Sequence, residues 1–166
     1  LTLKKIKKAI AELEYVPDLT AGTLSSKKSG FIAALVPFLN SSPLTDTIRA
    51  LDAHLREHRY QLLLGSTNYS IQQEEALLIE LLGRRPEAIV LTGSLHTSTS
   101  KRLLKRSGIP VVEIWDLPSA PIDLAVGYSN HDSGYQITQN LIDKGYQSIA
   151  YGITSSIDDR GEQRLQ

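Results

Sequence analysis

The chain has 166 residues, no cysteine and a formal net charge of zero, with 41% hydrophobic and 22% charged residues. This composition is typical of an ordinary globular protein, and the lack of cysteine excludes disulfides and thiolate metal sites. No apolar run approaches the roughly 20 residues that cross a bilayer, and the first residues lack the apolar core of a secretory signal. We therefore expect a cytoplasmic protein with no membrane partner.

Residues 3–14 form the first predicted element, because Ile6, Ala9, Ile10 and Leu13 recur at helical spacing. Six lysines against three carboxylates give residues 1–30 a charge of +3, so the remainder carries −3. Pro17 ends this helix. Residues 18–25 contain weak helix formers, and we expect this short stretch to become helical only when something binds it.

From residue 31 onward, apolar runs alternate with amphipathic helices. The predicted strands are 31–36, 60–64, 88–92 and 110–115, and the predicted helices are 45–58, 71–82 and 98–106. This alternation is typical of a doubly wound α/β fold, a parallel sheet with helices on both faces. On the second of these helices we expect Glu74, Glu75 and Glu80 to face solvent.

The last part of the chain resembles the beginning of another α/β unit. The run 120–128 leads into a predicted helix 131–144, with Ile137, Leu141 and Ile142 facing inward, and then into a predicted strand 148–151. A further helix begins near residue 158. We therefore expect the chain to be a fragment of a longer protein.

Ligands of open α/β sheets bind beyond the carboxyl ends of the strands. Here those ends carry mainly hydroxyl and amide side chains, which suit hydrogen bonding to a polyhydroxylated ligand. The alternative for any single Ser, Thr or Asn is that it satisfies the backbone of a turn. Arg160 and Arg164 are one helical turn apart and could hold one anion together, although 158–160 could also be an ordinary charged helix start.

Motifs for catalysis are missing from the sequence. It contains no phosphate-binding loop and no Gly-x-Ser-x-Gly elbow, so we expect neither an enzyme nor a cofactor. His54 and His58 are four residues apart on a predicted helix, but we find no carboxylate at ligand spacing and expect a solvated face without a metal. His96 and His131 follow strand ends, where either could touch a ligand, and for both we expect a surface position.

A set of short segments, in a fixed order, resembles a known family. These segments are Ala9-Ile-Ala-Glu-Leu-x-Tyr-x-Pro, Ala21-x-x-Leu24, Phe31-Ile-Ala-Ala-Leu-Val-Pro, Gly108-Ile-Pro-Val-Val-Glu, Val126-Gly-x-x-Asn and Leu141-Ile-x-x-Gly-x-x-x-Ile-Ala-Tyr. Together they resemble the lactose-repressor/galactose-repressor family of bacterial transcription regulators. Leu91-Thr-x-x-x-His-Thr, Val112-Glu-Ile and Ala125-Val-Gly are similar in particular to its gluconate-operon repressors.

The resemblance implies a division of the chain into three parts. Residues 1–29 would be the last helix of a DNA-binding headpiece, a hinge helix and a linker, without the recognition helix. Residues 30–127 would be the first subdomain of a periplasmic-binding-protein-like core, and residues 128–166 the start of the second. In the hinge, Thr23 and Leu24 would contact operator DNA, with Leu24 as a minor-groove wedge, although Asp18 and Gly22 depart from the usual pattern.

Effector residues follow from the same resemblance. They would be Asn40, Ser41, Leu44, Asp132, Arg160 and Arg164. An arginine pair beside hydroxyl donors would fit a sugar acid such as gluconate, and a neutral sugar held by one arginine is the alternative. The resemblance thus implies a homodimeric repressor of sugar or sugar-acid metabolism. The alternatives are a transport-type sugar-binding protein, against which residues 1–25 count, and a small α/β enzyme.

Overall fold

Five parallel strands form one sheet at the centre of the molecule, in the order β2-β1-β3-β4-β5. The computed structural model describes residues 2–16, 28–38, 42–153 and 159–166. The strands are β1 (Phe31–Val36), β2 (Gln61–Ser66), β3 (Ile89–Thr92), β4 (Val111–Ile114) and β5 (Leu124–Val126). The doubly wound parallel fold predicted from the alternation of apolar runs and helices is confirmed.

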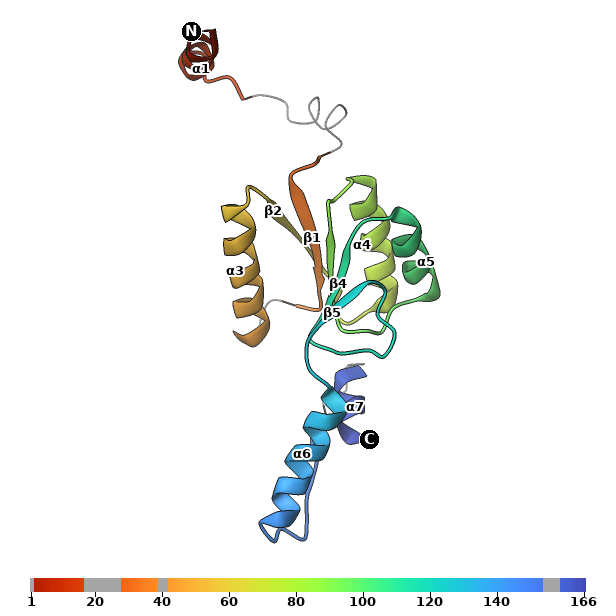
Figure 1. Ribbon diagram of the computed structural model, residues 1–166. Coiled ribbons are helices and arrows are strands. Elements are labelled where there is room, and N and C mark those ends of the chain that lie inside the picture. The colour runs from red at the N-terminus through yellow and green to blue at the C-terminus, as the bar shows by residue number, and fades with distance from the viewer. Residues whose placement is uncertain (1, 17–27, 39–41, 154–158) are drawn as a thin grey trace.

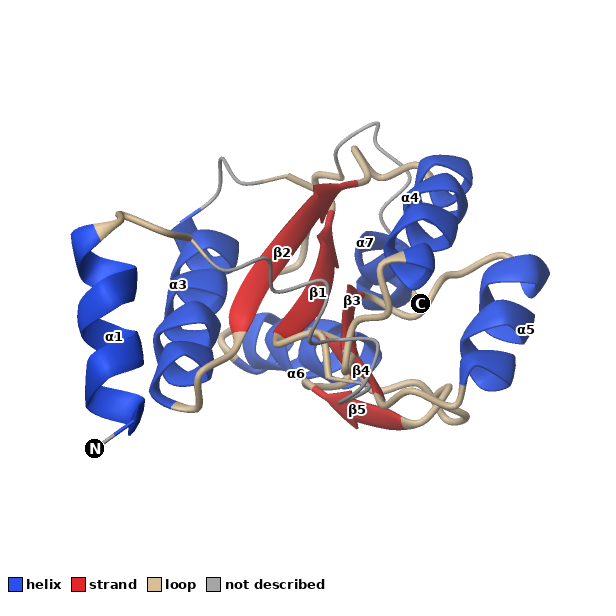
Figure 2. Cartoon of the chain, turned by 90° about the horizontal axis from the view of Figure 1, so that it is seen from above, coloured by secondary structure: helices blue, strands red, loops and turns tan. Residues whose placement is uncertain are grey.

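Helices cover both faces of this sheet. They are α3 (Ser42–Glu57), α4 (Ile71–Gly83) and α5 (Ser98–Ser107). Figure 2 shows the strands between α3 on one side and α4 with α5 on the other. Successive side chains of a strand point to opposite faces, so Leu35 of β1 packs with Leu78 and Leu104, whereas Ala34 packs with Leu51 and Leu55 of α3.

The predicted outward position of Glu74 on α4 is wrong. Ser70 caps α4, and its side chain accepts a hydrogen bond from the Gln73 N–H. This cap defines where α4 begins, and Glu74 in the first turn is buried while Glu80 is exposed. Glu74 is nevertheless paired, because its carboxylate lies 2.7 Å from the ring of His96. A buried carboxylate is tolerated where it gains such a partner.

Beyond β5 the chain leaves the sheet and forms α6 (Asn130–Asp143) and α7 (Asp159–Leu165), which contact each other (Figure 1). The prediction that the apolar stripe of α6 faces inward is wrong for two of its three members. Ile137 is 62% exposed and Ile142 is 52% exposed. Residues 148–151 do not form the predicted strand. Both differences have one cause, since no described strand lies beside this segment to pair with it or to be covered by α6.

The predicted amino-terminal helix is present as α1 (Thr2–Glu12). None of its described residues is buried, and Leu3, Ile6 and Leu13 are each more than half exposed. Its apolar stripe therefore contributes nothing to the core of the sheet. The predicted hinge residues Thr23 and Leu24 lie outside the described residues. Among the described helices, none is both long enough and apolar enough to cross a membrane.

Candidate functional site

A cavity of about 200 Å³ opens at the carboxyl ends of β1, β2 and β4. It is lined by Pro37, Phe38, Pro43, Leu44, Tyr69, Trp115, Arg160 and Arg164. These residues come from the ends of three strands, the first turn of α3, and α7. In open parallel sheets this is the edge where ligands bind, and the cavity therefore is the candidate functional site.

The walls of this cavity are largely aromatic. The ring of Phe38 meets that of Tyr69 edge to face, with centroids 5.2 Å apart, and Trp115 meets Tyr128 in the same way at 6.4 Å. Tyr69 and Trp115 have left-handed backbones, with φ of 60° and 72°. Such backbones are costly for bulky residues and cluster at functional sites. Rigid aromatic faces suit the apolar face of a small ring or chain ligand.

The polar side of the cavity is formed by α7. Arg160 and Arg164 both line the cavity, as their spacing of one turn predicts. The Arg164 Nε donates to the Asn130 Oδ1 at 3.0 Å, and its Nη2 lies 3.4 Å from the Tyr128 hydroxyl. Asn130 is itself buried at the start of α6. The guanidinium of Arg164 is thus oriented before any ligand arrives.

Gly134 lets α6 and α7 approach closely enough for this arrangement. A Cβ at this position would lie 2.2 Å from the Arg164 carbonyl oxygen and 2.8 Å from its Cα. Both are backbone atoms, which cannot move away without shifting α7. The absence of a side chain at Gly134 therefore helps to place Arg164 in the cavity.

Asp116, two residues after the end of β4, joins the sheet to the two following helices. Its carboxylate accepts hydrogen bonds from the Ser94 hydroxyl, the Gln163 and Asn130 amides, and the Leu117 N–H. Burial alone would raise its pKa, but these hydrogen bonds outweigh burial and lower the pKa of Asp116 below its ordinary value. One ionised side chain therefore holds β3, β4, α6 and α7 together.

The structure brings together three of the residues expected to bind an effector. Leu44 is 6% exposed, and it lines the same cavity as Arg160 and Arg164. Asp132 is on the exposed side of the first turn of α6 and does not line this cavity. Its carboxylate lies 3.2 Å from the His131 ring, and this bond lowers the pKa of Asp132. Asn40 and Ser41 lie outside the described residues.

Some of the individual side chains that form this site were not predicted from the sequence. Tyr69 lines the cavity, and Asn130 fixes Arg164, although neither was expected to do so. An aromatic residue within two or three positions of a strand end is the signal that points to Phe38, Tyr69 and Trp115. Asn130 ends the segment Val126-Gly-x-x-Asn, but this motif does not predict its contact with Arg164, because that contact depends on the packing of α6 against α7.

The expected surface position of His96 is wrong, because its side chain is buried between two carboxylates. Its Nδ1 lies 2.7 Å from the Glu74 Oε1, and its Nε2 lies 3.4 Å from the Glu113 Oε1. Burial alone would lower the pKa of His96, but the two carboxylates outweigh it and raise the pKa above 6.5. The cluster ties α4 and β4 to the loop between β3 and α5, which carries His96.

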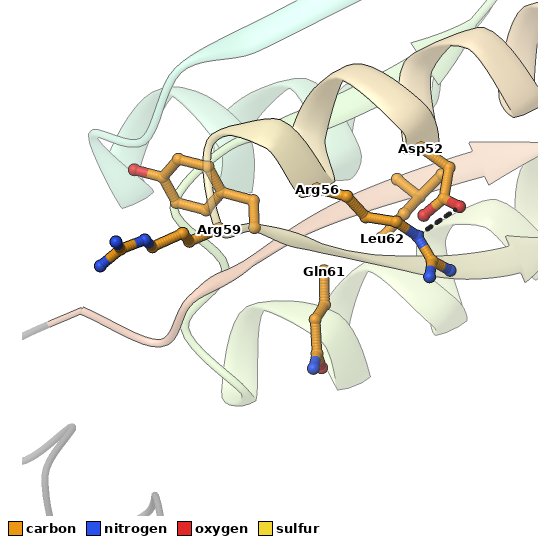
Figure 3. Close-up of a pocket in the computed structure, with 6 residues that line it drawn as sticks. Asp52, Arg56, Arg59, Gln61 and Leu62 are labelled. Atoms are coloured by element: carbon orange, nitrogen blue, oxygen red, sulfur yellow. Dashed lines mark hydrogen bonds and ion pairs between the residues drawn. The ribbon is translucent and has the colours of Figure 1, made fainter.

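A second hollow, of about 440 Å³, lies where α3 ends and β2 begins, at the amino ends of the strands and not at their carboxyl ends. It is lined by Asp52, Arg56, Arg59, Tyr60, Gln61 and Leu62 (Figure 3). The Arg56 Nε donates to the Asp52 Oδ2 at 2.8 Å, whereas Arg59 points away from this pair. The opposed charges of Asp52 and Arg56 cancel, and this hollow has no aromatic walls comparable to those of the cavity at the carboxyl ends.

Comparison with known proteins places this architecture in context. A family model described as periplasmic binding proteins and sugar binding domain of LacI family matches residues 29–164. Among curated proteins, the HTH-type transcriptional regulator GntR of Pseudomonas aeruginosa is 34% identical over 157 residues, which is 95% of this chain and 46% of that protein. The HTH-type transcriptional regulator GntR of Escherichia coli K12 is 31% identical over 156 residues, or 94% and 47%.

A solved structure gives the same result in three dimensions. The crystal structure of a LacI-family transcriptional regulator from Silicibacter pomeroyi superposes with a TM-score of 0.90 at 31% identity, over 98% of this chain and 49% of that one. The chain spans about half the length of the curated relatives it matches. The fold of the core and the course of the chain are therefore shared with these regulators.

Proposed function

The chain belongs to the family of periplasmic binding proteins and LacI-type sugar-binding domains, and from this membership we propose that it is part of a transcriptional repressor controlled by a small sugar or sugar-acid effector. The relatives that support this reading are named as transcriptional regulators. The single observation that carries it is the cavity at the carboxyl ends of the strands, with aromatic walls and two arginines on one face of α7.

The chemistry of the cavity favours an anionic polyhydroxylated effector such as gluconate. Arg160 and Arg164 would hold its carboxylate through charge-assisted hydrogen bonds, which are about twice as strong as neutral ones. Phe38, Tyr69 and Trp115 would cover the carbon chain. Of the other residues proposed from the resemblance, Leu44 would close the cavity beside α3, and Asn40 and Ser41 would supply hydroxyl and amide contacts. Asp132 lies too exposed to take part without a shift of α6.

The proposed response to the effector is a shift between two arrangements of the core. We propose a first subdomain of residues 30–127 and a second that begins at 128–166. Arg164 would bind the effector from the second subdomain, while Trp115 would bind it from the first. A ligand that contacts both favours the arrangement in which they are close. The change would reach residues 1–29, where Thr23 and Leu24 of the hinge would contact operator DNA in a homodimer.

Two other readings fit less of the chain. A transport-type sugar-binding protein would share the core, but it would not need the basic helix α1 with its lysines on one face. An enzyme would need a nucleophile with a base, and the described lining of the cavity holds arginines and aromatic rings instead. We therefore propose a cytoplasmic DNA-binding regulator that catalyses no reaction and needs no cofactor.

Calorimetry with gluconate and with a neutral hexose tests the effector assignment. We expect gluconate to bind and Arg160→Ala to weaken it by about 2 kcal/mol, the worth of a charge-assisted hydrogen bond. Arg106→Ala is the matched control, because Arg106 is an exposed arginine on α5 away from the cavity. Binding of the hexose without binding of gluconate would overturn the sugar-acid assignment. Equal gluconate affinities in the two variants would remove Arg160 from the site.

A further inference from the structure

The last turn of α3 and the residue that directly follows it carry two histidines and a glutamate, all three exposed. One ligand atom from each of His54, Glu57 and His58 lies within 4.8 Å of the other two. The expectation that no carboxylate lies at ligand spacing from the two histidines is wrong. Glu57 is three residues after His54, and positions i, i+3 and i+4 of a helix share a face. Within the described part of the chain, no other three histidine or carboxylate side chains bring one ligand atom each this close together.

The distances in this group fit a metal ion of the zinc type. Zinc binds imidazole nitrogen and carboxylate oxygen at about 2.0–2.2 Å in tetrahedral geometry, which places neighbouring ligand atoms about 3.3–3.5 Å apart. The His54 Nδ1 lies 3.4 Å from the Glu57 Oε2. The two imidazole rings have centroids 4.7 Å apart. All three side chains are exposed, so an ion reaches them directly and small rotations close the remaining separation.

A hydrogen bond already prepares His58 to act as a ligand. Its Nδ1 lies 3.0 Å from the His54 carbonyl oxygen. A carbonyl oxygen only accepts, so the Nδ1 carries the hydrogen and the Nε2 keeps a free lone pair. A backbone carbonyl commonly fixes metal-binding histidines in this way. Arg56 does not compete for Glu57, because its guanidinium is bonded to Asp52.

We propose that His54, Glu57 and His58 form a binding site for a divalent transition-metal ion such as Zn²⁺. Two imidazoles and one carboxylate select such ions over Mg²⁺ and Ca²⁺, which prefer sites built from oxygen. Three protein ligands leave a fourth position for water. The site is about 20 Å along α3 from Leu44, given the rise of 1.5 Å per residue. The metal site and the proposed effector cavity are therefore separate, and a failure of one proposal does not affect the other.

A calorimetric titration of the 166-residue chain with Zn²⁺ at neutral pH tests this site. We expect saturable binding of one ion, with His54→Ala and His58→Ala each weakening it by about tenfold or more, and Glu57→Gln weakening it less. Co²⁺ should give the visible absorption of a tetrahedral site in the unaltered chain and lose it in His58→Ala. All three positions are exposed, so circular dichroism should show that the variants fold alike.

His131→Ala is the matched control, because His131 is also exposed and also lies beside a carboxylate, that of Asp132. It should bind Zn²⁺ as the unaltered chain does. Absence of saturable binding at millimolar Zn²⁺ would overturn the proposal. So would equal affinities in His54→Ala, His58→Ala and His131→Ala, since the ion would then be held elsewhere.

Discussion

The sheet with its helices and the pair α6–α7 are built from similar amphipathic segments but are stabilised differently. In the sheet region, apolar side chains of β1, β3, α4 and α5 form a continuous buried cluster. In α6 the buried residues are Asn130 and Gly134, while Ile137 and Ile142 are exposed. An amphipathic sequence thus becomes core only where a second layer covers it. The α6–α7 pair is instead attached through hydrogen bonds and one close backbone contact.

The largest expected contrast between the two regions lies in the cost of removing an apolar side chain. Leu91 of β3 is fully buried against both neighbouring strands and α4. Leu91→Ala should therefore lower the free energy of unfolding by about 2–5 kcal/mol, the usual loss for a cavity in a packed core. Urea denaturation followed by circular dichroism measures this loss.

Ile137→Ala is the counterpart in α6. Because Ile137 is 62% exposed, this substitution should change the free energy of unfolding by less than about 0.5 kcal/mol. A cost close to that of Leu91→Ala would mean that α6 is covered in solution, for instance by another chain. The difference between the regions would then belong to the isolated chain alone.

The same contrast explains how much of the fold could be predicted from the sequence. The helices of the sheet region and strands β1 to β4 follow from local periodicity, because each apolar run there has a partner. Strand β5 was not predicted as a strand. The apolar periodicity around Ile137 and Ile142 correctly predicts the helix α6 but not the burial of these two side chains. Burial also requires a neighbouring element, which the periodicity does not reveal. Glu74 and His96 were expected at the surface because each is a polar residue. Both are buried because Glu74 of α4 pairs with His96 in the loop after β3, and the local sequence does not show this pairing.

In the candidate site, too, some residues could be predicted from local spacing and others depend on contacts between distant segments. The spacing of Arg160 and Arg164 sufficed to put both side chains on one face, since both lie on one short helix. The role of Asp116 could be inferred only as a strand-end position. Its bonds to Asn130 and Gln163 join segments 14 and 47 residues away. Such contacts depend on how α6 and α7 return to the sheet, which no local pattern encodes.

A smaller effect should follow from disturbing the close contact between α6 and α7. Gly134→Ala would place a Cβ 2.2 Å from the Arg164 carbonyl oxygen, and relief requires α7 to shift. We expect a loss of about 1–3 kcal/mol, typical of overpacking, confined to this pair. Hydrogen exchange should accelerate in α6 and α7 and remain unchanged in β1 and β3.

Gly83→Ala is the control for this substitution. Gly83 ends α4, and an added Cβ there meets no atom within 4 Å. Alanine is the better helix former, so this variant should be neutral or slightly more stable. If Gly134→Ala also left exchange in α7 unchanged, the close contact would not be what attaches the pair.

The smallest expected effect is a pH dependence of stability. One titrating group in each region should cause it, and the two groups act in opposite pH ranges. His96 belongs to the sheet region, where Glu74 of α4 and Glu113 of β4 raise its pKa above 6.5 against the opposing effects of burial and of Lys101 on α5. The folded chain therefore holds this proton more tightly than the unfolded chain. The resulting stability is complete below about pH 6.5 and is lost as pH rises through the folded pKa.

Asp116 at the junction with α6 and α7 has the opposite dependence. Its pKa is lowered from 3.8, so its contribution is present above that pH and is lost as pH falls through the folded pKa. Urea midpoints from acid to mildly alkaline pH should therefore decline on both sides. His96→Gln should remove the alkaline decline only, and Asp116→Asn the acid decline only. An alkaline decline of unchanged size in His96→Gln would show that a group other than His96 causes it.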